Sequence, residues 1–119
     1  MPEPFLLLVT GGRDYANRDR VFATLDAVAA KHPNITILTG AATGADALAE
    51  QWAKEREHPY YGVPARWTTL GKKAGPERNA RMLFYLPHGV CAFPGGDGTA
   101  NMCQQAEQAG VKVWRVDDA

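Results

Sequence analysis

Three glycine-rich segments each follow an apolar run and have the composition of strand-to-helix turns that bind an anion. They are TGGRD at residues 10–14, TGAATGAD at 39–46 and FPGGDGT at 93–99. Glycine adopts backbone angles that other residues avoid, and its missing side chain lets a ligand approach the backbone amides. The start of the following helix adds unpaired N–H groups and a partial positive charge. One such turn is explained equally well by architecture alone, but three together favour a ligand site.

Basic side chains are concentrated between residues 66 and 81, where the only acid is Glu77. Arginine binds phosphate through charge-assisted, often bidentate hydrogen bonds. Arg13 and Arg78 are the stronger candidates because each lies beside a glycine turn or a helix start, whereas the lysines are also explained as an exposed, solvated loop. The basic residues of this segment are Arg66, Lys72, Lys73, Arg78 and Arg81.

Two residues near these segments have two interpretations each. Thr43 and Asp46 have nearly the spacing of a capping box, and an acid in the first turn stabilises a helix by about 0.3–1 kcal/mol, so a structural role for Asp46 is preferred to a contact with a ribose hydroxyl. Trp67 is either packed in the core, the preferred interpretation, or a platform for a nucleobase. The tyrosines are interpreted as packing residues: Tyr60, Tyr61 and Tyr85.

The elements that would position these residues alternate between strands and helices. Apolar runs predict strands at 5–10, 35–39, 60–65, 90–93 and 112–116, the third and fifth at the sheet edges. Helical spacing predicts helices at 17–31, from 45 to 53, from Pro76 to about Leu86, and through Met102 to Ala109, with Gly110 as cap and residues 66–76 as a loop. Such alternation indicates parallel βαβ units.

The predicted fold is therefore α/β, a single Rossmann-like domain over residues 1–119. Its doubly wound parallel sheet has about five strands in the order 3-2-1-4-5, with helices on both faces. This order places the first and fourth strands side by side, so GGRD and PGGDGT face each other across one crevice.

Composition narrows the classes of partner. Thirteen basic and thirteen acidic residues cancel, which argues against nucleic acid or a membrane surface. No run approaches the roughly 20 apolar residues of a membrane span, and the N-terminal segment is a poor signal peptide, so a cytoplasmic location is expected. Two cysteines and three histidines lack the spacing of metal ligands, and no metal site is expected.

Four blocks of sequence resemble the YspA-like, YpsA-related branch of the SLOG superfamily. They are LVTGGRDY, GAATGADALAEQWA, W…GKKAGPERNARML and AFPGGDGTANM, in the family's order and spanning about Phe5 to Val116. The resemblance implies a Rossmann-type domain of bacterial or phage proteins that binds nucleotides or nucleotide-derived ligands. The superfamily also includes the lonely-guy phosphoribohydrolases, DNA-processing protein A and a molybdenum-cofactor carrier.

The phosphoribohydrolases carry the pattern PGGxGTxxE, and this chain departs from it at the glutamate. Met102 occupies that position; Arg78 matches the catalytic arginine of those enzymes, but Asn79 departs from their Arg-Lys pair. Cleavage of an N-glycosidic bond needs a carboxylate to stabilise a cationic sugar or to activate water. The positions that match are Pro94, Gly95, Gly96, Gly98 and Thr99, and the acids that could replace the glutamate are Asp14, Asp46, Glu77 and Asp97.

The predicted function is binding of a nucleotide or nucleotide-derived phosphorylated ligand at the carboxyl ends of the strands, with no cofactor required. The alternative is an N-glycosidase with a displaced carboxylate, for which Arg78 and Asp97 are the catalytic candidates; single-stranded DNA binding is less favoured. A homodimer or higher homo-oligomer would be compatible with the alanine-rich second helix. The predicted ligand-binding residues are Gly11, Gly12, Arg13, Asp14, Gly40, Thr43, Gly44, Asp46, Lys72, Arg78, Asn79, Pro94, Gly95, Gly96, Gly98 and Thr99.

Overall fold

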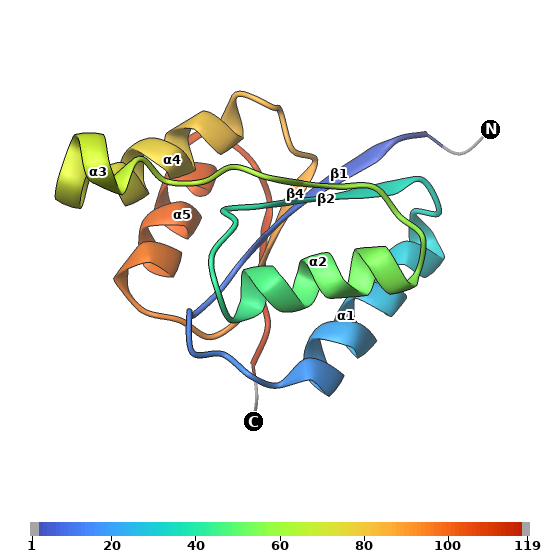
Figure 1. The fold of residues 1–119 in the computed structure, drawn as a ribbon. Helices are drawn as coiled ribbons and strands as arrows, with labels where there is room; N and C mark the ends of the chain where they lie inside the picture. The colour runs from blue at the N-terminus through green and yellow to red at the C-terminus, as the bar shows by residue number, and fades with distance from the viewer. Residues whose placement is uncertain (1–2, 118–119) are drawn as a thin grey trace.

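A five-stranded parallel sheet forms the centre of the computed structural model, which describes residues 3–117 (Figure 1). Its strands are β1 (Phe5–Thr10), β2 (Ile35–Thr39), β3 (Tyr60–Gly62), β4 (Gly89–Ala92) and β5 (Val113–Arg115). They lie in the order β3-β2-β1-β4-β5, and every neighbouring pair is parallel. The predicted fold class and strand order are confirmed.

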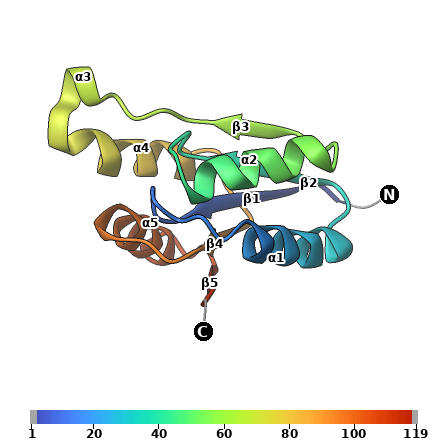
Figure 2. The same ribbon diagram turned by 60° about the horizontal axis from the view of Figure 1, so that its bottom comes forward.

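Helices cover both faces of this sheet (Figures 1 and 2). Helices α1 (Arg18–Lys31) and α2 (Ala45–Glu55) pack together on one face, and α4 (Ala74–Leu83) and α5 (Asp97–Gln108) on the other. The connection from β3 to α4 contains a short helix, α3 (Trp67–Leu70), and the 3₁₀ turn η1 (Gly71–Lys73). Each strand-to-helix turn therefore emerges at the same edge of the sheet.

The alternation of side chains along β1 builds the core on both faces. Leu7 and Val9 pack with Trp52 of α2, whereas Leu8 packs with Met102 of α5, and all five are fully buried. Burying a side chain of this size contributes about 1.5–3 kcal/mol. The carboxyl end of β1 is thus held rigidly between two layers of helices.

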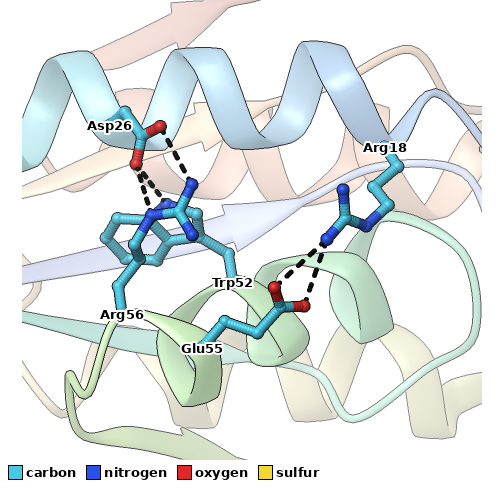
Figure 3. Close-up of polar contacts among 5 residues, drawn as sticks. All are labelled: Arg18, Asp26, Trp52, Glu55 and Arg56. Carbon is cyan, nitrogen blue, oxygen red and sulfur yellow. Dashed lines mark hydrogen bonds and ion pairs between the residues drawn. The ribbon is translucent and has the colours of Figure 1, made fainter.

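A polar network joins α1 to α2 on the surface above this core (Figure 3). Asp26 of α1 accepts a hydrogen bond of 2.8 Å from the indole N–H of buried Trp52 and bonds of 3.1 and 3.3 Å from Arg56. The bond from Arg56, and then that from Trp52, lowers the pKa of Asp26. Arg18 and Glu55 form a second, exposed ion pair at 3.1 Å. Asp26 is the important acceptor, because without it a buried indole N–H would lack a partner.

Helix α4 and the segment before it differ from the prediction. The helix begins two residues earlier than predicted, so that Pro76 is its third residue, where a missing N–H is still tolerated. The helix ends at Leu83 instead of about Leu86. Leu86 has a φ of 57° and precedes Pro87, and a residue before proline disfavours the helical conformation. Residues 66–76 are not one loop, since they contain α3 and η1.

The prediction that the tyrosines pack in the interior is wrong. Tyr60 and Tyr61 are 41% and 62% exposed, because β3 is a three-residue edge strand whose residues all face solvent. Tyr85 is 59% exposed, since it follows the end of α4.

Within residues 3–117, no helix is long and apolar enough to cross a membrane.

Candidate functional site

The turns after β1 and β4 lie against each other at the carboxyl edge of the sheet. Gly12 N–H donates to the carbonyl of Pro94 at 2.8 Å, and Phe93 N–H donates to the carbonyl of Thr10 at 2.9 Å. A Cβ on Gly95 would lie 2.7 Å from the nitrogen of Gly12, and one on Gly12 would lie 3.0 Å from the oxygen of Pro94. Gly95 is therefore required for the close packing of the two turns, and a side chain at Gly12 would force Pro94 to shift.

The second turn packs onto the first in the same way. Gly44 has a φ of 72°, and a Cβ there would overlap the carbonyl oxygen of Gly12. A Cβ on Gly11 would overlap the Cβ of Ala45 at the start of α2. Ala45 N–H also donates to the carbonyl of Gly12 at 3.1 Å. The three turns thus form one continuous backbone surface.

A cavity of about 570 Å³ opens on this surface, between the turns and the first residues of α4 and α5. Gly40 and Thr43 line a neighbouring cavity of about 310 Å³, and Pro94 and Gly95 line another of about 330 Å³. Asp14 and Gly44 line none of these three; Asp14 is exposed, and Gly44 is enclosed by the first turn. The predicted residues that line the main cavity are Gly11, Gly12, Arg13, Asp46, Lys72, Arg78, Asn79, Gly96, Asp97, Gly98 and Thr99.

The start of α5 presents open backbone to the main cavity. A Cβ on Gly96 or Gly98 would meet no atom within 4 Å, and neither glycine has a positive φ. Neither packing nor backbone conformation therefore requires glycine at these two positions. Among the described residues, the amides of Asp97, Gly98 and Thr99 have no hydrogen-bond partner. This is the arrangement in which a helix N-terminus binds an anion.

Arg78 of α4 is held in a fixed orientation at the cavity wall. Its Nη1 donates to the carbonyl of Gly40 at 2.6 Å, and its Nε donates to the side chain of Asn79 at 3.0 Å. The guanidinium lies so close over Gly40 that a Cβ there would overlap it. Its Nη2 makes no hydrogen bond to any residue within 3–117. Burial lowers the pKa of Arg78, and the Asp46 carboxylate opposes this effect.

Asp46 is almost fully buried, at 5% exposure, and its carboxylate is used by the turn after β2. Its Oδ2 accepts hydrogen bonds from the amides of Gly40 at 3.0 Å and Ala42 at 3.3 Å. The predicted capping box does not form: Gly44 is the N-cap of α2, and the Thr43 hydroxyl donates to the carbonyl of Arg13 instead. Two amides of this turn are consequently occupied by a side chain.

Burial raises the pKa of Asp46 to about 6, against the opposing effects of the Ala42 amide and of Arg78. Behind it, the Thr39 hydroxyl donates to Glu50. Asp46 is thus a buried acid that lines the main cavity and has a pKa near neutrality. A buried carboxyl group of this kind is typical of functional sites.

Amide side chains join α4 to α5 beneath the cavity. The Asn79 amide donates to the carbonyl of Gly98 at 3.3 Å and to Oδ1 of Asn101 at 3.1 Å. Gln105 donates to the same Oδ1 at 2.7 Å. Asn79 is only 3% exposed, and its hydrogen bonds to Gly98 and to Arg78 hold the start of α5 close to Arg78.

Trp67 is not a core residue, so the preferred interpretation from sequence is wrong. It is 47% exposed at the start of α3 and lines the main cavity. The guanidinium of Arg13 lies over its ring, 4.9 Å from the centroid. An isolated aromatic residue in a polar segment cannot be assigned to core or surface from its neighbours in sequence.

Several residues that line the cavity were not predicted from sequence. Asn101 follows Asp97 by four residues and so lies on the same face of α5, a spacing that identifies it once the helix start is placed. Gly75 is the second residue of α4 and lies one residue before the predicted start at Pro76, within the segment that was predicted to be a loop. The unpredicted lining residues are Thr10, Ala42, Gly75, Pro76 and Asn101, whereas Trp67 was placed at the ligand only by the less favoured of its two interpretations.

The fold and the crevice define a small Rossmann-like domain of the ligand-binding type. The chain belongs to the YspA, cpYpsA-related SLOG family, whose model matches residues 5–69, and the predicted resemblance is confirmed. The gene 61 protein of Mycobacterium phage D29 is 32% identical over an alignment of 120 positions, which covers 94% of this chain and 96% of the phage protein.

Solved structures of larger proteins share the fold. DNA processing protein A from Streptococcus pneumoniae matches with a TM-score of 0.78 and 18% identity, over 98% of this chain and 51% of that protein. The Moco carrier protein from Chlamydomonas reinhardtii matches with a TM-score of 0.69 and 22% identity, over 96% and 76%. At these identities the likeness establishes the common fold.

Proposed function

We propose that this protein binds a nucleotide or nucleotide-derived phosphorylated ligand in the main cavity, with the phosphate at the N-terminus of α5. The observation that carries the proposal is the open backbone at Gly96 and Gly98. Most glycines of the three turns are explained by packing, but these two are not. Their missing side chains leave the unpaired amides of Asp97, Gly98 and Thr99 accessible to an anion.

The charges around the cavity support the same assignment. Three cationic side chains line it, against the carboxylates of Asp46 and Asp97; the cations are Arg13, Lys72 and Arg78. Arg78 is the most important of them, because two hydrogen bonds already fix its orientation and its Nη2 is left for a ligand. A charge-assisted hydrogen bond from a preorganised arginine contributes about 1.5–3 kcal/mol.

Calorimetric titration with AMP tests the proposal through matched lysines. Lys72 lines the cavity, whereas its neighbour Lys73 does not. We expect Lys72→Gln to weaken binding and Lys73→Gln to leave it unchanged. We expect Arg78→Gln to weaken binding by about 10- to 150-fold, the equivalent of one charge-assisted hydrogen bond. Equal losses in the two lysine variants would show that the cavity does not hold the phosphate.

Glycine substitution gives a second test that is independent of charge. Gly98→Ala adds a methyl group where the phosphate is proposed to lie, although the protein itself has room for it. AMP affinity should therefore fall while the free energy of unfolding stays at or above that of the wild type. An unaltered affinity for AMP in this variant would place the phosphate elsewhere.

Hydrolysis of an N-glycosidic bond is the second candidate function, and Asp46 is the observation that favours it. Met102, at the position of the glutamate in the related pattern, is fully buried in the core and cannot reach a ligand. Asp46 instead supplies a carboxyl group to the cavity with a pKa of about 6, which suits a general acid or base near neutral pH.

Release of adenine from AMP separates the two functions. Turnover that disappears in Asp46→Asn while AMP still binds would assign the carboxylate to Asp46, whereas loss in Asp97→Asn alone would assign it to Asp97. Binding by the wild type without base release would reject the hydrolase and leave the binding function in place.

A further inference from the structure

We infer that Trp67 is the stacking platform for the nucleobase of the ligand, so that the site distinguishes nucleotides from sugar phosphates. This inference rests on the proposed function. It names the nucleobase as the second part of the ligand that the protein recognises, in addition to the phosphate. It is carried by the exposure of Trp67, by the neighbours of its ring and by its position in the cavity.

The exposure of Trp67 is not explained by packing within the protein. Every residue of α3 and η1 is at least partly exposed, so this segment does not serve to bury apolar surface. In Figures 1 and 2, α3 stands beside α4 at one end of the molecule, beyond the sheet. An indole that is 47% exposed leaves apolar surface in water that a bound aromatic ring would cover.

Two neighbours limit the orientations of the ring before any ligand binds. The Arg13 guanidinium lies over the ring, 4.9 Å from its centroid, as in cation–π pairs. The edge of the ring approaches the start of α4, where Cη2 would be 3.4 Å from a Cβ on Gly75. A preorganised aromatic surface loses less side-chain entropy on stacking than a mobile one.

The position of the ring complements that of the proposed phosphate site. Trp67 and the open backbone at Gly96 and Gly98 line the same cavity of about 570 Å³ but come from different elements, α3 and α5. A nucleotide carries an aromatic base and a phosphate on one ribose, and both features of this cavity match it. A sugar phosphate would engage only the α5 side.

AMP and ribose 5-phosphate test this inference because they differ by the base alone. Base–aromatic stacking strengthens binding by about 5- to 150-fold per base, so the wild type should bind AMP more tightly than ribose 5-phosphate by a factor in this range. We expect Trp67→Leu to remove that preference without changing the affinity for ribose 5-phosphate.

Trp114→Leu is the matched control, because Trp114 is 39% exposed on β5 and does not line the main cavity. It should retain both wild-type affinities. If both ligands bind but Trp67→Leu keeps the preference for AMP, or weakens both ligands equally, the base does not stack on Trp67 and the inference fails alone. If the wild type binds neither ligand, the proposed function fails and the inference with it.

Discussion

Substitution of Asp46 by asparagine should change the pH dependence of stability in a predictable way. The ordinary pKa of this carboxyl group is 3.8, and burial raises it to about 6 in the folded protein. Between these pH values the folded state binds more protons than the unfolded state. The free energy of unfolding therefore falls as the pH rises through this window and is not changed further by Asp46 above it.

The size of the effect follows from the difference between the two values. At about 1.4 kcal/mol for each pKa unit, the step from 3.8 to about 6 corresponds to about 3 kcal/mol. Asparagine has nearly the shape of the protonated acid, and its side-chain oxygen can accept the same amide hydrogen bonds from Gly40 and Ala42. Wild type and Asp46→Asn should be equally stable near pH 3, below the ordinary pKa of the acid, and the variant should be more stable by about 3 kcal/mol near pH 7.

Urea denaturation of both proteins across this pH range measures the difference directly. Asp19→Asn on the exposed side of α1 also removes one negative charge and should change stability by no more than about 1 kcal/mol. The reasoning is refuted if Asp46→Asn differs from the wild type by the same amount at every pH, or if it is the less stable protein at neutral pH. A carboxylate that destabilises the fold to this extent is expected where it serves a ligand or a reaction.

Three further predictions concern packing and partners. Gly95→Ala should destabilise the fold by about 2 kcal/mol or more, because its Cβ would lie 2.7 Å from the nitrogen of Gly12. Thermal unfolding measures this loss of stability, and the control Gly98→Ala should show none. Asp26→Ala should lower the free energy of unfolding in urea by about 1–3 kcal/mol, because the buried Trp52 N–H is left unpaired. Glu55→Ala breaks only an exposed ion pair and should lower it by less than about 1 kcal/mol. Equal losses would contradict this account of the network. Single-stranded DNA should not be retarded in a gel shift at low salt, and a salt-sensitive complex would reverse that expectation.

The sheet was predictable because its signals are local. Each buried strand is an apolar run closed by glycine, and the helices between them have apolar residues at helical spacing, so right-handed βαβ units leave few arrangements. The start of α4 was not predictable to the residue, because Ala74 and Gly75 carry no local signal for a helix start, whereas its early end has a local signal in Pro87, since a residue before proline disfavours the helical conformation.

The site was predictable only in outline. Sequence indicates that the glycine turns meet, but it cannot separate glycines that pack against another turn, such as Gly12 and Gly95, from those that stay open, such as Gly98. The role of Asp46 was also hidden, since its acceptance of two amides depends on the path of the turn after β2. These contacts depend on how the turns pack in three dimensions, and no local sequence pattern indicates them.

An amide-resolved NMR titration with AMP tests the central claim most directly. If the phosphate binds at the N-terminus of α5, the largest chemical-shift changes should occur at the amides of Asp97, Gly98 and Thr99, together with the guanidinium N–H groups of Arg78. A second cavity is lined by Thr24 and Val28 of α1 and by Trp114 of β5. Shifts confined to that cavity, or no saturable shifts at the three α5 amides and Arg78, would contradict the account.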